Sequence, residues 1–133
     1  MNDKMRRAIG SALLLGTIGA AMLSIPAGVA AKDGDIIRRG DCSGAADWKL
    51  KLSPENGRIE VEFEVDQNIN GRVWDITLKR NGNTFFTGTR TTQAPSGSFE
   101  VRRLTNNGAG SDFVVARAVA RSNGQVCRGT ATF

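Results

Sequence analysis

The chain has 133 residues, 18 of them basic and 13 acidic, and it contains neither histidine nor tyrosine. The missing histidine removes the commonest general base and the commonest metal ligand, and the missing tyrosine removes a frequent proton donor. We therefore predict that the protein is not an enzyme and that it uses no metal and no cofactor.

The first segment is typical of a secretory signal peptide. Basic residues stand at the start, an apolar stretch follows, and Pro26 precedes a run of small residues with cleavage sites after Ala30 and Ala31. An uncleaved membrane anchor fits less well, because Pro26 interrupts the segment and no second apolar stretch follows. We predict that residues 1–31 are removed, that residues 32–133 are secreted as one extracellular domain, and that no membrane span remains after processing.

The mature chain soon reaches Arg39-Gly40-Asp41, the tripeptide that adhesive proteins offer to integrin receptors. Such a match arises by chance in about a few per cent of chains of this length. Integrin recognition needs the Arg and Asp side chains at the tip of a protruding loop, whereas residues 35–42 read as an extended segment leading into a sheet. We expect Arg39 and Asp41 to be solvent-facing edge charges, and we do not expect integrin binding.

The rest of the chain is divided by turn signals into short segments in which apolar and polar residues alternate. Asn and Gly tolerate the positive φ that hairpin turns require, and Asn-Gly pairs stand at 56–57, 70–71, 81–82, 107–108 and 123–124. The alternation between the turns is the signature of β-strands. It predicts seven strands at residues 46–52, 58–66, 72–80, 84–92, 98–104, 111–120 and 126–133.

The same alternation predicts which side chains form the core and which face solvent. Phe85 and Phe113 are expected to face outward. Both tryptophans fall on inner faces, which assigns them to the core and not to a sugar-binding surface. The predicted inner positions are Ala46, Trp48, Leu50, Leu52, Ile59, Val61, Phe63, Val65, Trp74, Ile76, Leu78, Phe99, Val101, Val114, Ala116, Ala118, Ala120, Cys127, Gly129, Ala131 and Phe133.

Short strands at this spacing, without helical periodicity, predict an all-β antiparallel two-sheet sandwich of the immunoglobulin or fibronectin III type with about seven strands. A small barrel is the alternative. Cys42 and Cys127 are the only cysteines, and in an exported protein an isolated pair most simply forms a disulfide. Closing this span contributes about 4 kcal/mol in the chain-entropy model. The rival interpretation, free thiols in redox or metal chemistry, lacks a CxxC spacing.

Three glutamates, Glu60, Glu62 and Glu64, recur along the outer face of one predicted strand. A carboxylate pair could support glycoside hydrolysis, and Glu60, Glu62 and Asp66 could hold calcium, but no cleft and no calcium-loop spacing accompanies them. We instead expect cross-strand ion pairs. The predicted register places Lys49 opposite Glu62 and Lys51 opposite Glu60.

Charge is distributed unevenly along the chain. Residues 32–78 carry 7 basic and 10 acidic residues, whereas residues 79–133 carry 8 basic and 2 acidic residues. Pairing of the basic half with the acidic half in the folded sheets is the favoured interpretation. The alternative is a patch that attracts cell-wall phosphates or, nonspecifically, nucleic acid. The residues of this candidate patch are Arg102, Arg103, Arg117, Arg121 and Arg128.

Four stretches of the sequence, "RRGDCSGAADWKLKL", "GRIEVEFEVD", "APSGSFEVRR" and "CRGTATF", resemble small secreted single-domain proteins of unknown function from actinomycete-type bacteria. The resemblance covers nearly all of the mature chain. It implies export, a sandwich-like fold and the disulfide. It implies no activity, so it transfers no functional residue.

These observations favour a secreted, non-catalytic binding module that interacts with cell-envelope material or an extracellular protein. A second hypothesis is an inhibitor or effector that acts through an exposed loop, at residues 67–71, 93–97 or 105–111. A histidine-free hydrolase is the third hypothesis, and it would need a pocket with perturbed carboxylates.

Overall fold

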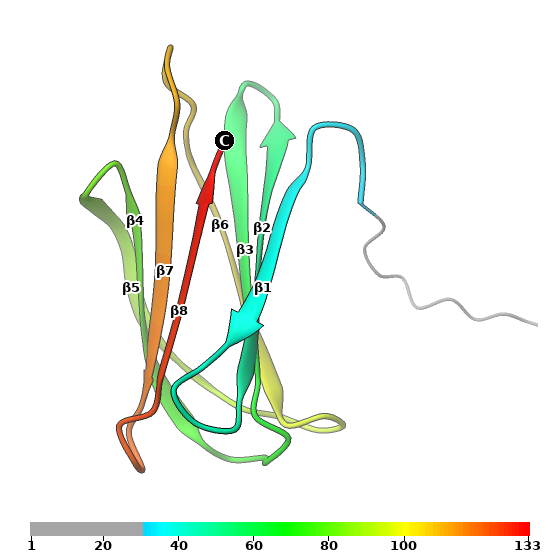
Figure 1. The fold of residues 1–133 in the computed structure, drawn as a ribbon, viewed down its shortest axis with the longest axis vertical. Helices are drawn as coiled ribbons and strands as arrows, with labels where there is room; N and C mark the ends of the chain where they lie inside the picture. Colours follow the sequence, from blue (N-terminus) through cyan, green and yellow to red (C-terminus); the bar gives the residue numbers. More distant parts are fainter. Residues whose placement is uncertain (1–30) are drawn as a thin grey trace, which may run out of the picture. The chain divides into compact units, whose positions relative to one another are not determined.

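Eight β-strands make up the part of the chain that the computed structural model describes, residues 31–133 (Figure 1). The all-β prediction is confirmed, and all seven predicted strands are present. The additional strand, β1, covers a segment for which the sequence predicts only an extended chain. The strands are β1 (Ile36–Asp41), β2 (Asp47–Glu55), β3 (Arg58–Asp66), β4 (Val73–Arg80), β5 (Asn83–Thr91), β6 (Ser98–Asn106), β7 (Phe113–Ala120) and β8 (Val126–Thr132).

The predicted signal peptide, residues 1–31, lies outside the described residues apart from Ala31. Within residues 31–133, no helix is long and apolar enough to cross a membrane.

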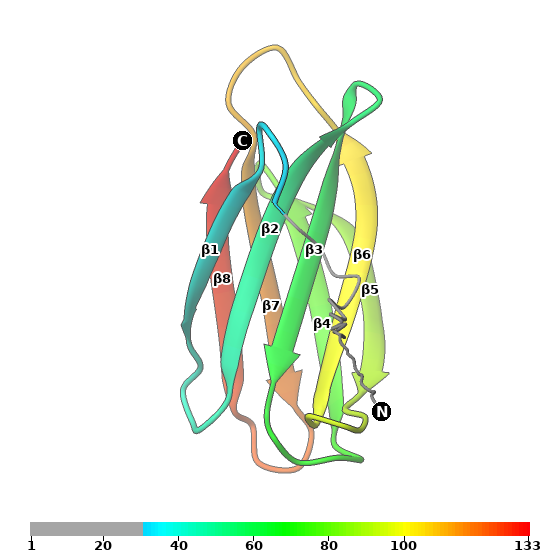
Figure 2. The ribbon, with the colours of Figure 1, turned by 90° about the vertical axis from the view of Figure 1, so that its right-hand side faces the viewer.

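The strands form two four-stranded antiparallel sheets, which confirms the predicted sandwich. The first sheet has the order β1-β2-β3-β6 and the second the order β5-β4-β7-β8. Figure 2 shows β1 beside β8 at one side of the sandwich and β6 beside β5 at the other. Apart from the additional strand β1, the connectivity is of the immunoglobulin type, because two consecutive strands of the first sheet, β2 and β3, lead into the second sheet and β6 later returns to the first.

Two Asn-Gly pairs form two-residue hairpin turns. Asn56 and Gly57 have φ values of 50° and 77°, and Asn81 and Gly82 have φ values of 48° and 83°. Two successive residues with positive φ define a type I′ turn, whose twist matches that of the flanking strands. The sequence signal therefore identified both the place and the kind of these turns.

The tight turn at Asn56-Gly57 changes the predicted pairing of β2 with β3. The prediction assumed a turn that began at Pro54, whereas Pro54 lies within β2. The strands consequently pair Lys49 with Glu64 and Lys51 with Glu62. The predicted partners, Glu62 for Lys49 and Glu60 for Lys51, are wrong by two positions.

Apolar side chains from both sheets fill the space between them, as the alternation predicts. Phe63 from the first sheet and Trp74 from the second are fully buried. The indole ring of Trp74 packs against Phe99 with 6.0 Å between ring centroids. Trp48 and Phe133 are only partly buried, and the other predicted inner residues are buried.

Trp48 closes the side of the sandwich where β1 approaches β8. A Cβ atom on Gly40 of β1 would lie 2.7 Å from Cζ2 of Trp48, and a Cβ atom on Gly129 of β8 would lie 2.7 Å from its Cε3. The indole ring thus occupies space that any larger residue at either position would need. This packing explains why the central residue of the Arg-Gly-Asp tripeptide is a glycine.

A β-bulge explains why the two phenylalanines of β5 do not follow the predicted alternation. Leu78 pairs with Phe86, but its neighbour Lys79 pairs with Thr84, which leaves Phe85 as the extra residue of β5. A bulge of this kind re-aims the side chains around it. Phe85 is half-buried and packs against the core, so the prediction that it faces outward is wrong. The same prediction is confirmed for Phe113, which is 44% exposed.

The predicted disulfide between Cys42 and Cys127 is present. Cys42 directly follows β1 and Cys127 lies in β8, so the bond joins the two sheets at the side where β1 approaches β8. In antibody domains the bridge instead joins two central strands. The bond therefore supports one side of the sandwich and the loops next to it.

Candidate functional site

The outer side of the first sheet carries charges of both signs, and we call it the mixed-charge face. Its carboxylates stand at the outer positions of β1, β2, β3 and β6, among basic residues on the same strands. The carboxylates are Asp41, Asp47, Glu55, Glu60, Glu62, Glu64, Asp66 and Glu100, and the basic residues are Arg39, Lys49, Lys51, Arg58 and Arg102.

Glu62 lies in the middle of the mixed-charge face and is nevertheless only 2% exposed. Its Oε2 atom is 3.9 Å from the Lys51 ammonium and 3.2 Å from the Arg102 guanidinium. Lys51, which is also buried, lies 3.8 Å from Asp35. The prediction that the three glutamates line an open outer face is therefore wrong for Glu62, whose charge is held inside a network that spans three strands.

The pKa shifts in this network follow from its charges. Glu62 raises the pKa of Arg102. Burial and the neighbouring carboxylate of Glu62 raise the pKa of Glu100. Burial alone would raise the pKa of Asp35, but the Lys32 backbone N–H and the Lys51 charge outweigh it, so that this pKa is lowered. The Glu62 carboxylate thus pairs with the cations of the neighbouring strands and does not line one of the hollows described below.

The Arg39-Gly40-Asp41 tripeptide lies inside β1, paired with β2, and not at the tip of a loop. Arg39 and Asp41 are exposed, as expected. They line an open hollow of about 460 Å³ on the mixed-charge face, together with charged residues of β2 and β3. Among residues 31–133, no group of acidic side chains is arranged to hold a metal ion.

The structure does not bring the five predicted arginines into one patch. Arg102 belongs to the Glu62 network. Its neighbour Arg103 turns the other way and stacks on the Phe86 ring, 4.2 Å from the centroid. Arg121 pairs with Asp75 at 2.9 Å. Only Arg117 and Arg128 remain together, on the outer side of the second sheet.

We call this outer side of the second sheet the basic face. Arg117 and Arg128 stand directly opposite each other on β7 and β8. They line a hollow of about 320 Å³ together with Lys79, Thr77 and Val115. Within the described residues, none of these three basic side chains forms an ion pair with a carboxylate. Threonines surround the cluster at the outer positions Thr77, Thr87, Thr89, Thr130 and Thr132.

Lys79 is a functional candidate that sequence reasoning missed. It precedes the turn at Asn81-Gly82 and lies 38 positions before Arg117 in the sequence. The sequence signal was its outward position in the alternation of β4, but the pairing of β4 with β7 was needed to place it beside the arginines.

A third region is the end of the sandwich where four loops meet, and we call it the loop end. The loops β1–β2, β3–β4, β5–β6 and β7–β8 all lie there, at the lower end of Figure 1. Two of the predicted functional loops, 67–71 and 93–97, are in contact: the Gln67 N–H donates to the Gly97 carbonyl at 3.0 Å. The third predicted loop, 105–111, connects β6 to β7 at the opposite end.

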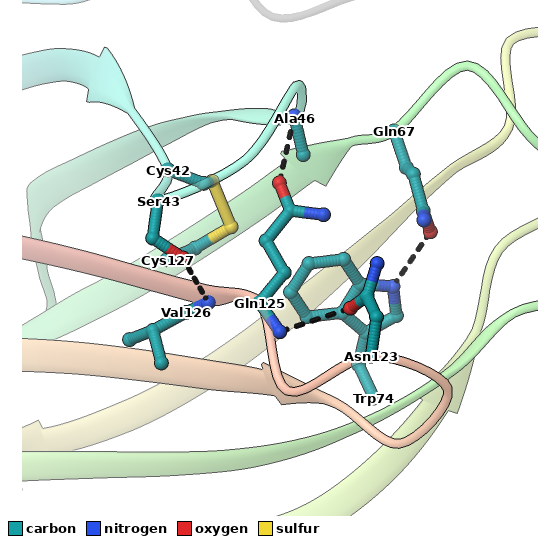
Figure 3. Close-up of a disulfide and its surroundings, with 9 residues drawn as sticks. All are labelled: Cys42, Ser43, Ala46, Gln67, Trp74, Asn123, Gln125, Val126 and Cys127. Atoms are coloured by element: carbon teal, nitrogen blue, oxygen red, sulfur yellow. Dashed lines mark hydrogen bonds between the residues drawn. A yellow bond between two sulfur atoms is a disulfide. The ribbon is translucent and has the colours of Figure 1, made fainter.

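The disulfide and a set of hydrogen bonds hold the loop end together (Figure 3). The Ser43 N–H donates to the Val126 carbonyl at 2.8 Å, and the Val126 N–H donates to Ser43 Oγ at 2.9 Å. The Gln125 N–H donates to Asn123 Oδ1 at 2.9 Å. These loops frame an open hollow of about 370 Å³.

The comparisons with known proteins assign no family. No protein-family model matches the sequence, and no curated protein matches it. The resemblance to secreted actinomycete-type proteins therefore stays a prediction, and the candidate sites depend on their geometry alone.

Proposed function

We propose that the mature domain is an exported, non-catalytic binding module that holds a phosphate-bearing polymer of the cell envelope on its basic face. The observation that carries this proposal is the direct pairing of Arg117 with Arg128, with Lys79 in the same hollow and no ion pair between these three residues and a carboxylate of residues 31–133. Like charges placed opposite each other in a sheet are destabilising. A bound anion would remove this repulsion.

The chemistry of the surrounding surface supports the proposal. Threonine hydroxyls can donate hydrogen bonds to phosphate oxygens without a fixed charge. The cluster lies on the regular strands β4, β7 and β8, which hold the three cations at fixed spacings. A polymer with regularly repeated phosphates suits such a surface better than a single small anion, because several weak contacts act together.

The test is sedimentation of the disulfide-bonded mature domain with the producing cell's wall fraction at low and moderate salt. Walls treated with cold hydrofluoric acid, which cleaves phosphodiesters, serve as the comparison. We expect retention that falls with salt and is lost on the treated walls, since phosphate contacts dominate such binding. The double variant Arg117→Ser/Arg128→Ser should bind about tenfold more weakly.

The matched control is Arg38→Ser/Arg58→Ser, which removes the same charge from two exposed arginines outside the basic face. It should retain binding. Equal loss in both double variants would show that only net charge matters and would overturn the assignment to the basic face. Retention on the treated walls would overturn the phosphate chemistry.

A further inference from the structure

Two glutamine side chains at the loop end are almost completely buried. Gln67 is 9% exposed and Gln125 is 8% exposed. They come from loops far apart in the sequence, the β3–β4 and the β7–β8 connections, and both line the hollow of about 370 Å³. Neither amide nitrogen is among the described buried atoms that lack a hydrogen-bond partner, so both nitrogens remain accessible from the hollow.

The orientation of each amide is dictated by a partner that can only donate. The Trp74 indole N–H donates to Gln67 Oε1 at 3.0 Å, and the Ala46 backbone N–H donates to Gln125 Oε1 at 2.8 Å. An amide nitrogen could not accept these bonds, so both oxygens must face inward. Figure 3 shows the Gln125 nitrogen pointing away from Ala46, to the side on which Gln67 lies. Neither amide nitrogen donates to another described residue.

The hollow is therefore rich in donors and carries no formal charge. Asn123 uses its side-chain oxygen to accept from the Gln125 backbone, which leaves its amide nitrogen free to donate. Ser43 accepts from Val126 through its oxygen and keeps its hydroxyl proton. The described residues that line it are Ser43, Gly44, Ala45, Gln67, Ile69, Asn123, Gly124 and Gln125.

We propose that this hollow binds a short uncharged peptide segment of another protein. The carbonyl oxygens of the segment accept hydrogen bonds from Gln67 and Gln125, and an apolar side chain covers Ile69, which is 47% exposed. An anionic ligand is disfavoured because two carboxylates adjoin the site in the sequence and would repel it. Asp47 directly follows Ala46, and Asp66 directly precedes Gln67. A sugar is disfavoured because no aromatic ring lines the hollow.

The site is independent of the basic face, since none of its lining residues belongs to the outer side of the second sheet. Peptide binding here would give the domain a protein partner in addition to an envelope polymer. Its rigidity suits this role, because the disulfide and the hydrogen bonds of the loop end order the donors before a ligand arrives.

The experiment is selection of a random peptide display library on the disulfide-bonded mature domain, followed by affinity measurement on variants. Gln67→Glu and Gln125→Glu keep the inward oxygen and replace the outward donor by an acceptor that carries a negative charge. We expect the selected peptides to be uncharged, with an apolar residue, and to bind each variant about tenfold more weakly. Ile69→Ser, an exposed change that leaves the fold intact, should also weaken binding. Gln93→Glu adds the same charge to an exposed loop residue outside the hollow and should have no effect.

Side-chain amide NMR signals provide the second readout, because a bound carbonyl shifts the NH₂ resonances of Gln67 and Gln125 directly. A selection that enriches no peptide, or peptides that bind both glutamate variants as well as the original, would overturn the proposal. Acidic peptides whose binding is lost in Arg117→Ser/Arg128→Ser would also overturn it, and would support the basic face instead. Loss of wall binding in that arginine variant with peptide binding intact would show that the two sites are separate.

Discussion

The two outer faces of the sandwich use their charges in opposite ways. On the mixed-charge face, Glu62 is buried between Lys51 and Arg102, so that these charges stabilise one another. On the basic face, Arg117 and Arg128 stand side by side and find no carboxylate among the described residues. On the first face a buried carboxylate lies between two cations, whereas on the second face the carboxylate of Asp75 is paired with Arg121 and forms no ion pair with Arg117 or Arg128.

The difference shows how a charge gradient along a chain becomes a difference between surfaces. Strands β1, β2 and β3 come from the acidic half and form most of the first sheet, whereas β4, β5, β7 and β8 form the second. Only β6 brings basic residues of the second half into the first sheet, where Arg102 reaches Glu62. The favoured prediction that the two halves neutralise each other holds at Arg102 and at Arg121, which pairs with Asp75, and fails at Arg117 and Arg128.

The largest expected effect comes from removing the covalent link between the sheets that carry these faces. Cys42→Ala/Cys127→Ala should lower the free energy of unfolding by about 4 kcal/mol, because the unlinked unfolded chain gains entropy. Urea unfolding followed by tryptophan fluorescence measures the change. In this variant, wall binding and the native tryptophan emission should disappear at the same urea concentration. Loss of wall binding well before unfolding would show that the basic face depends on the link locally.

Glu62→Ala should cost about 3 kcal/mol, since it removes the carboxylate shared by Lys51 and Arg102 and leaves buried Lys51 with Asp35 alone. The matched change on the other sheet is Asp75→Ala, which removes an exposed carboxylate beside exposed Arg121. That variant should unfold at an unchanged urea concentration. Equal effects of the two variants would contradict the contrast between the two faces.

Gly40→Ala should destabilise the domain by about 2 kcal/mol, because the added methyl group meets the Trp48 ring. Arg39→Ala, the adjacent exposed change, should leave the urea midpoint unchanged. Urea unfolding measures the shift in midpoint of each variant, which should be present for Gly40→Ala and absent for Arg39→Ala. An unperturbed Gly40→Ala variant would remove the packing explanation for the central glycine of the tripeptide.

Arg128→Glu should stabilise the domain slightly, by about 0.5 kcal/mol, because it replaces a repulsive pair opposite Arg117 by an attractive one. The same change should abolish retention on cell walls. Thermal unfolding and wall sedimentation test the two effects on one variant. A destabilised variant would mean that Arg128 has a favourable partner.

The smallest effects are those of pH on the mixed-charge face, and they have opposite signs. The pKa of Asp35 lies below its ordinary value of 3.8, so its stabilisation is present above that pH and is lost as the pH falls further. The pKa of Glu100 lies above its ordinary value of 4.5, so ionised Glu100 opposes folding at neutral pH. Asp35→Asn should lower the urea midpoint at pH 7, and Glu100→Gln should raise it. The difference should shrink in acid.

Much of the fold could be predicted because the relevant signals are local. Alternation of apolar and polar residues assigns Val61 and Phe63 to the core without knowledge of any partner strand. The turn at Asn81-Gly82 follows from the φ preferences of two residues. The predicted register of β2 with β3 was wrong because several turn-forming residues follow one another at 54–57, and the sequence does not show which of them belong to the strands. Only Asn56 and Gly57 form the turn, and Pro54 belongs to β2.

The candidate sites could be predicted only in part. The outward direction of Arg117 follows from alternation, and its exposure agrees with that prediction. The burial of Glu62 could not be predicted, since it depends on Arg102 from a strand 40 positions later. The donor hollow also could not be predicted, because no local pattern links Gln67 with Gln125.

By itself the sequence determined the places of seven of the eight strands and, except at the Phe85 bulge, their inner faces. It also determined two of the turns and the pairing of the only two cysteines. Each of these depends on residues close together in the chain or on the absence of alternatives. Tertiary structure alone decided which strands share a sheet. That choice separated Arg102 from Arg117 and Arg128 and brought Lys79 beside them. It also directed two glutamine amides into one hollow. The physical reason is that charge and hydrogen-bond complementarity act between side chains that are neighbours in space, and neighbours in space are set by strand order.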